Sequence, residues 1–260
     1  MSAVLADVST YEVQSPRLTR LRAAAAEDLR ILAVLHDREL DRELIHALWR
    51  DCYEDFLGLR LQGDRASHAL GMLREGLTEI PTELCQATLD RLAADYADIY
   101  LTYGLRASPC ESVWLDDDNL TLQEPMFRVR AWYRRYGLAV TDWRKRSDDH
   151  LVYELRFLAH LLDGEGEPVD LGEVGRFMDE HPLRWVPQFA ERVAGRCATQ
   201  LYAGLALLTA AYLDELRDLV AELVGMPRPS AEELAASVIP VTGWELEVEG
   251  PYLPGVAPSW

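Results

Sequence analysis

The chain has 260 residues, of which 49% are hydrophobic and 27% are charged, a globular composition that excludes a disordered or fibrous protein. Asp and Glu number 44 against 26 Lys and Arg, and the net charge of −18 disfavours nucleic acid and favours cationic partners. Lys145 is the only lysine, which excludes a P-loop and leaves little room for Schiff-base chemistry.

Helical periodicity dominates the chain, with apolar residues at steps of three and four. In chain order we predict helices over 18–36, 41–59, 64–77, 89–103, 125–136, from an N-cap at Ser147 to 162, 172–179 and 201–223. Only 244–248 alternates as a strand does. The fold class is therefore all-α, with a bundle-like body over 1–224 and an irregular Pro-rich tail over 225–260 that packs on or flanks it.

Targeting and membrane signals do not appear in the sequence. The N-terminal residues lack a basic stretch followed by an apolar core, so no signal peptide is predicted. The longest apolar run, 201–213, is too short to span a bilayer. We therefore expect a cytoplasmic protein with reduced thiols that is not a membrane protein.

Motifs of catalysis and metal binding are also missing. The sequence has no GxSxG, GxGxxG, HExxH or CxxC, and no two histidines are three or four residues apart. The run DDDN at 116–119 resembles the start of a calcium loop, but it lacks the glycine at the sixth position and the glutamate at the twelfth. We expect a solvated turn there, no bound metal and no enzyme activity.

The segment 108–150 is unusually rich in aromatic residues, carboxylates and arginines. Aromatic side chains beside carboxylates suit a peptide that has an apolar stretch and cationic flanks. Burial of the tyrosines in the core and helix capping by the aspartates are the ordinary alternative. The aromatic residues concerned are Trp114, Trp132, Tyr133, Tyr136 and Trp143.

Four motif-like stretches follow one another along the chain. They are DIYL at 98–101 with SPCESVW at 108–114; EP at 124–125 with WY at 132–133 and GL at 137–138; DHLVYELRFL at 149–158; and Phe177, His181, Trp185 and Phe189. Over roughly residues 20–225 they resemble the TorD/DmsD/NarJ family of redox-enzyme maturation chaperones. Arg146-Ser147 depart from the family's usual Glu-Pro at the hinge, which makes this loop freer, and Cys110 replaces a usual aromatic.

The resemblance implies a TorD-type fold with a hinge loop near 143–149 and a system-specific chaperone function. Its partner would be the apo catalytic subunit of a molybdenum-cofactor oxidoreductase. The chaperone would bind the twin-arginine leader or N-terminal region of that subunit, assist cofactor insertion and hold back export. No cofactor would be bound stably, with transient contact to the molybdenum cofactor or guanine nucleotide near 144–146. We expect a monomer, with a dimer as the alternative.

The expected peptide-binding residues come from this segment and this resemblance. Asp149 and His150 are expected to project from the start of their helix, where Asp149 would accept hydrogen bonds from a cationic peptide. The tail from Gly225 is expected to matter less for client binding than 108–158. The alternative is a helical small-molecule binder or enzyme built around Asp149, His150, Glu154 and His181. The full set of expected peptide-binding residues is Trp114, Glu124, Trp132, Tyr133, Trp143, Asp149, His150 and Glu154.

Overall fold

The structure is a computed structural model that describes residues 16–51, 57–141, 145–164, 169–230 and 232–234. These residues form helices and no strand, which confirms the all-α prediction, and none of their helices is long and apolar enough to cross a membrane. The elements are α2 (Pro16–Asp37), α3 (Arg42–Asp51), α4 (Asp64–Thr78), α5 (Gln86–Tyr96), the π-helical turn η1 (Ala97–Leu101), α6 (Ser112–Leu115), α7 (Glu124–Arg135), α8 (Leu151–Asp163), α9 (Leu171–Glu180), α10 (Pro182–Ala194) and α11 (Gln200–Val224).

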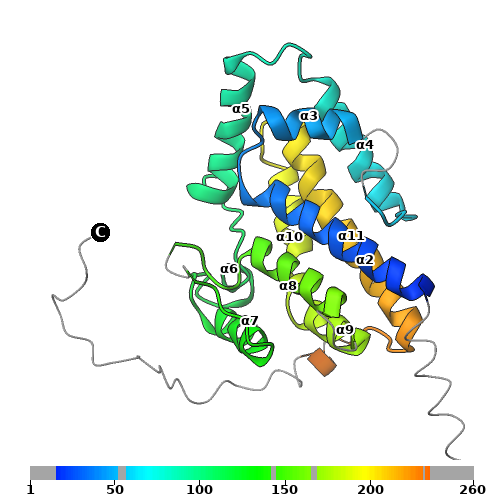
Figure 1. Cartoon of the computed structure of the whole chain (residues 1–260). Coiled ribbons are helices and arrows are strands. Elements are labelled where there is room, and N and C mark those ends of the chain that lie inside the picture. The colour runs from blue at the N-terminus through cyan, green and yellow to red at the C-terminus, as the bar shows by residue number, and fades with distance from the viewer. Residues whose placement is uncertain (1–15, 52–56, 142–144, 165–168, 231, 235–260) are drawn as a thin grey trace, which may run out of the picture.

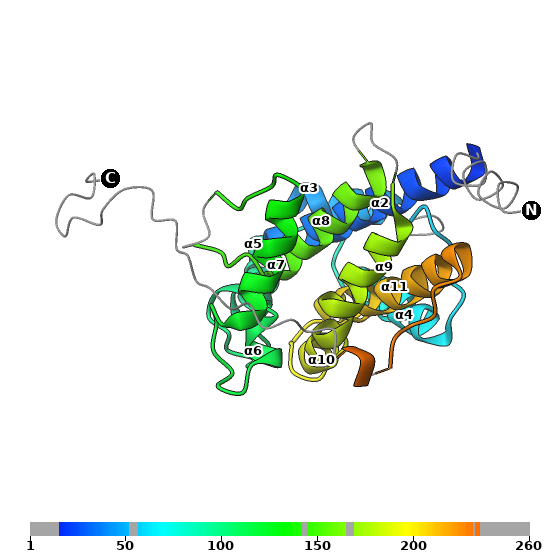
Figure 2. The same ribbon diagram turned by 90° about the horizontal axis from the view of Figure 1, so that it is seen from below.

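Helix α11 is the centre of the body. It packs along α4 and α10 and also contacts α9 and α2 (Figure 1). Its predicted apolar stripe is buried from Leu201 to Leu216, whereas Leu223 is exposed near the end of the helix. Helix α2 packs along α8, which lies beside α9 (Figure 2). Helices α6 and α7 gather at the opposite end of the body from α3 and the α4–α5 connection (Figure 1).

The predicted helix ends are confirmed where glycine supplies a left-handed backbone. Gly137 follows α7 with φ 69°, and Gly225 caps α11 with φ 66°. The predicted start of α7 at a proline is also confirmed, because Pro125 lies in its first turn.

Three predictions about the helices are wrong, each for a local reason. The cap of α8 is His150, whose Nδ1 accepts from the Val152 amide at 3.2 Å, and not Ser147. The helix predicted to reach Leu59 does not do so, because the carboxylate of Asp28 accepts from the amides of Gly58 and Leu59 and holds a bend there. Helix α10 was not predicted, since the sequence favours a helix that begins only after Pro187, and Pro187 instead lies inside α10.

The predicted strand at 244–248 lies outside the described residues, as does the part of the hinge loop at 142–144. The remaining hinge residues, 145–149, form turns and bends, as expected for a loop. One isolated antiparallel bridge joins Cys110 to His150, directly after this loop. The loop before α6 and the start of α8 are therefore connected by backbone pairing.

Helices α4 and α11 approach each other at two glycines. A Cβ atom at Gly204 would lie 2.4 Å from the backbone nitrogen of Leu73, and one at Gly76 would lie 2.4 Å from that of Leu201. Both obstacles are backbone atoms, which cannot turn aside as a flexible side chain can. The two helices can therefore pack this closely only because neither glycine has a side chain.

We predict that Gly204→Ala lowers the free energy of unfolding by about 1–3 kcal/mol, because the methyl group forces α4 and α11 apart. The matched control is Gly71→Ala inside α4, where a Cβ meets nothing within 4 Å. It should raise stability by roughly 0.5–1 kcal/mol, the ordinary helix preference for alanine. Urea unfolding of both variants checks the pair, and equal effects of the two would contradict the close approach.

Candidate functional site

A buried polar cluster lies where the start of α6, the start of α8 and the α9–α10 junction meet. The backbone connects the first two, because the Glu111 amide donates to the Asp149 carbonyl at 3.0 Å and the Leu151 amide donates to the Pro109 carbonyl at 2.8 Å. The Asp149 carboxylate strengthens this connection by accepting from both the amide (2.7 Å) and the hydroxyl (2.5 Å) of Ser112. Asp149 and Ser112 are fully buried.

Two further buried carboxyl groups complete the cluster. Glu111 lies 3.0 and 3.1 Å from Nδ1 of His181, and Glu154 accepts from the indole N–H of Trp185 at 3.2 Å. The charges of Glu111 and Glu154 act on each other, and Oε1 of Glu154 is buried without a hydrogen-bond partner in the described structure. Two carboxylates have only acceptor atoms, so a hydrogen bond between them would require a proton on one of them.

The electrostatics of the cluster favour the protonated form of its glutamates. Burial, reinforced by the charge of Asp149, raises the pKa of Glu111 well above its ordinary value. Burial also raises the pKa of Glu154, with the charges of Glu111 and Asp149 adding to it. Burial lowers the pKa of His181 to about 3, so its imidazole is neutral at pH 7. These pKa shifts favour a protonated carboxyl group and a neutral His181 over an ion pair between Glu111 and His181.

His150 and Cys110, which face each other across the bridge, are also kept in their neutral forms by burial. It lowers the pKa of His150 well below its ordinary value and raises that of the Cys110 thiol well above its own. A neutral His150 suits its role as helix cap, because an uncharged Nδ1 can accept a hydrogen bond. A protonated thiol is a poor nucleophile, so Cys110 has no reactive character here.

Helix α7 is fastened to the rim of the cluster by polar and aromatic contacts. The Tyr133 hydroxyl donates to the Asp148 carbonyl at 3.0 Å, and Arg130 donates to both carboxylate oxygens of Asp148, at 3.2 and 3.0 Å. The Trp132 indole N–H donates to Glu180, at the end of α9, at 2.9 Å. The Tyr133 ring packs on Phe157 of α8, with centroids 4.8 Å apart.

The structure brings half of the expected peptide-binding residues together. Tyr133, Asp149, His150 and Glu154 lie in the buried cluster or at its edge. The expectation that Asp149 and His150 project from their helix is wrong, since they are 0% and 4% exposed. The start of α6 covers Asp149, because the amide and the hydroxyl of Ser112 take the place of water at its carboxylate.

Trp114, Glu124 and Trp132, also expected to bind the peptide, lie on separate parts of the surface. Trp114 is partly exposed below the guanidinium of Arg192, which lies 4.4 Å from the ring centroid. Glu124 pairs with Arg128 in the first turn of α7 at 2.6 Å. Trp132 is partly exposed on the α9 side of α7, and Trp143 lies outside the described residues.

The alternative site is assembled but inaccessible. Asp149, His150, Glu154 and His181 do lie close together, as a small-molecule site would require, but none is more than 4% exposed. No group of three or more metal-ligating side chains occurs among the described residues. The arrangement therefore serves to hold three segments together and offers no open site for a substrate.

The α6–α7 loop, residues 116–123, forms an exposed surface. The sequence predicts only a solvated turn there. Asp117 and Asp118 are exposed as expected, but Leu120 and Leu122 beside them are 56% and 43% exposed. Large apolar side chains in an acidic turn are the signal that could have identified this surface from sequence. The loop combines negative charge with apolar area, as the recognition of a cationic and apolar peptide requires.

We predict that Glu154→Gln removes part of the pH dependence of stability. Above about pH 4.5 Glu154 loses its proton in the unfolded chain, whereas the folded cluster keeps it. The stability that this proton contributes to the wild type is therefore present at low pH and is lost as the pH rises. Glutamine can make the same hydrogen bonds without titrating. The unfolding free energy of the wild type should fall relative to the variant by about 1.4 kcal/mol per pH unit for one proton.

Urea unfolding between about pH 5 and pH 8 measures this difference. The contributions of the buried histidines occur in both proteins and cancel. The exposed Glu79→Gln is the control and should give a curve parallel to the wild type. Parallel curves for Glu154→Gln would contradict a contribution of Glu154 to the pH dependence of stability.

Comparison with known proteins identifies the relatives of this chain. A family profile described as nitrate reductase delta subunit matches residues 64–191. The chain is 30% identical over 141 residues to the chaperone protein TorD of Vibrio cholerae, covering 51% of this chain and 64% of that protein. It is 33% identical over 112 residues to TorD of Vibrio vulnificus, covering 40% and 52%.

A longer match is with the chaperone protein TorD of Shewanella loihica, 25% identical over 197 residues, which covers 74% of this chain and 90% of that protein. The matches with the two Vibrio proteins span about half to two thirds of those relatives. The profile match contains α4 to α9 and most of α10, and with them the whole buried cluster. Over the stretch that contains the buried cluster, the chain is therefore similar to chaperones named TorD and to the nitrate reductase delta subunit family.

Proposed function

We propose that this protein is a cytoplasmic, system-specific chaperone for the catalytic subunit of a molybdenum-cofactor oxidoreductase. It binds the twin-arginine signal peptide or the N-terminal region of the apo subunit, assists cofactor insertion and holds back export until maturation is complete. The observation that carries the proposal is the similarity to chaperones named TorD over the stretch that contains the buried cluster. Those relatives are chaperones and not enzymes, in agreement with the expectation of no enzyme activity.

The α6–α7 loop supports a peptide as the ligand. A twin-arginine leader joins two arginines to an apolar stretch, and this loop places Asp117 and Asp118 beside the exposed Leu120 and Leu122. Complementary charge speeds and orients the encounter, while the apolar side chains supply area to bury. The net charge of −18 also attracts a cationic peptide, and it does so over a longer distance than the contacts of this loop.

The buried cluster is bonded to the two helices that flank this loop. Asp149 binds Ser112 at the start of α6, and Tyr133 of α7 binds the carbonyl of Asp148. The two helices that flank the α6–α7 loop are therefore both bonded to the segment before α8. In this proposal Asp149, His150 and Glu154 position the peptide-binding surface, while Trp114, Glu124 and Trp132 are partly exposed on separate parts of the surface.

Contact with the molybdenum cofactor or guanine nucleotide is a transient event in this proposal, and the described residues do not form a ready site for either. In the basic run 144–146, Arg146 pairs with Asp37 and donates to its carbonyl, so this guanidinium is already engaged. Arg144 lies outside the described residues. We propose a monomer as the working form.

The proposal is tested by purifying the tagged full-length chain from its native host and identifying what is bound to it. The expected result is a large molybdenum-cofactor subunit that still carries its leader. Recovery of the chain without any such subunit, from cells that are expressing the oxidoreductase, would count against the proposal.

We predict that the double substitution Asp117→Asn, Asp118→Asn weakens binding of a twin-arginine leader peptide about three- to tenfold, since exposed charge pairs contribute roughly 0.2–1 kcal/mol each. The difference should shrink as salt is added. The control, Glu79→Gln with Glu83→Gln, makes the same change in net charge in the α4–α5 connection, at the other end of the body (Figure 1). Calorimetry measures the affinities, and an equal loss in both variants would mean that net charge alone matters.

A further inference from the structure

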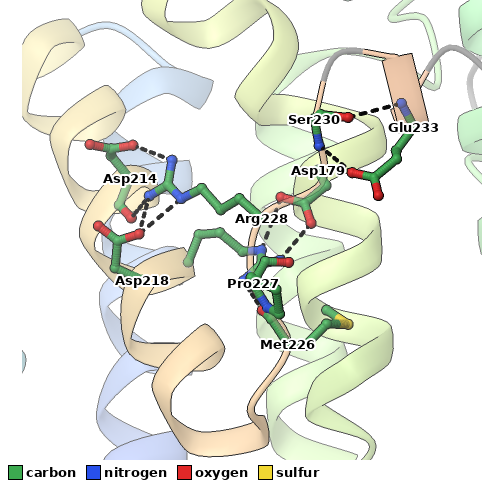
Figure 3. Close-up of polar contacts among 9 residues, drawn as sticks. Asp179, Asp214, Asp218, Met226, Pro227, Arg228, Ser230 and Glu233 are labelled. Atoms are coloured by element: carbon green, nitrogen blue, oxygen red, sulfur yellow. Dashed lines mark hydrogen bonds and ion pairs between the residues drawn. The ribbon is translucent and has the colours of Figure 1, made fainter.

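The first residues of the tail form a strap across α9 and α11. We define the C-terminal strap as residues 225–230, drawn in Figure 3 with the side chains that hold it. Gly225 turns the chain out of α11, and the Met226 amide still donates to the Ala221 carbonyl at 3.2 Å. The terminal methyl group of Met226 then lies over Gly175 of α9, where a Cβ atom would come within 2.6 Å of it.

A fully buried arginine of α11 holds the strap from inside. Arg217 donates to both carboxylate oxygens of Asp179 in α9, at 2.9 and 2.7 Å. The same guanidinium donates to the carbonyls of Met226 at 3.1 Å and Pro227 at 3.3 Å. One side chain therefore joins α11, α9 and the strap. Without the strap carbonyls, part of a buried cation would lose its partners, which proteins tolerate poorly.

The outer part of the strap is held by weaker, partly exposed contacts. Arg228 donates to Asp214 at 2.6 Å and to Asp218 at 2.9 Å, both on α11 (Figure 3). Ser230 and Glu233 then bond reciprocally, at 2.7 and 3.2 Å, as a helix capping box does. Exposed ion pairs of this kind contribute little, so the inner contacts of Arg217 are the ones that matter.

The far end of α9 leads directly to the candidate site. Asp179 pairs with Arg217 beside the strap, while its neighbour Glu180 accepts from the indole N–H of Trp132 on α7. The next residue, His181, is the one that contacts Glu111 in the buried cluster. Three consecutive residues therefore connect the strap, helix α7 and the cluster, and a displacement of α9 moves all three contacts together.

We propose that the C-terminal strap positions α9, and through it α7 and the buried cluster, so that the peptide-binding unit extends to residue 230. The strap is a positioning element that touches no peptide itself. The tail from Gly225 was expected to matter less for client binding than 108–158, and this proposal gives its first residues an indirect part in that binding. The part of the inference that concerns binding rests on the proposed function, whereas the part that concerns α9 does not.

The test uses the full-length chain with Met226→Gly and Pro227→Gly together, which frees the backbone that presents both carbonyls and removes the methionine from Gly175. The control is Pro229→Gly, the same kind of change beyond the reach of Arg217. Two measurements are made at a temperature where all proteins are folded by circular dichroism. One is amide hydrogen exchange, with α5 as internal reference, and the other is calorimetry with a synthetic twin-arginine leader peptide.

In the double variant we expect exchange of the α9 amides to accelerate about tenfold or more while α5 is unchanged, and leader affinity to fall about tenfold. Pro229→Gly should match the wild type. Unchanged α9 exchange, or faster exchange with unchanged affinity, would overturn the inference. If the wild type itself binds no leader peptide, the proposed function fails. The exchange data then test only whether the strap positions α9. If the double variant does not fold, Arg217→Lys, which keeps the charge beside Asp179, is judged by the same criteria.

Discussion

The carboxylate of Asp149 is the contact on which this end of the molecule depends. It is fully buried and accepts two hydrogen bonds from Ser112, which joins the start of α6 to the start of α8. Burying a carboxylate costs free energy unless it is hydrogen-bonded, and Ser112 bonds one oxygen of Asp149, whereas Oδ1 has no partner in the described structure. The contact with Ser112 puts Glu111 beside His181 and Glu154, and so determines where the α9–α10 junction lies.

The residues on which the family resemblance rests are largely residues of the interior. Glu111, Asp149, Glu154, His181 and Trp185 are all buried, and most bond to one another across three segments of the chain. A motif of charged residues is usually interpreted as a contact surface, yet here it holds the architecture. The surface that it supports, in the α6–α7 loop, has no motif of its own.

The sequence was sufficient to predict the periodic helices, but it was not sufficient to predict the contacts between distant segments. The apolar stripes of α8 and α11 are long and regular, and they are buried as predicted except near the end of α11. The burial of Asp149 could not be predicted in this way, because an aspartate before a helix has the same pattern whether it caps the helix in water or bonds a residue 37 positions away. Helix α10 was missed for a related reason, since Pro187 is tolerated inside it only through packing that the local sequence does not show.

The pairing of α4 with α11 has a consequence during synthesis. Their close contact at Gly76 and Gly204 joins helices that end at Thr78 and Val224, so the ribosome adds 146 residues between completing one and completing the other. At about 5–20 residues per second, the apolar face of α4 waits roughly 7–30 s for its partner. During this interval Leu73 and Leu77, both buried in the finished protein, have no α11 to cover them. A protein proposed to protect an unfinished enzyme is thus itself dependent, for much of its synthesis, on whatever shields nascent chains in the cell.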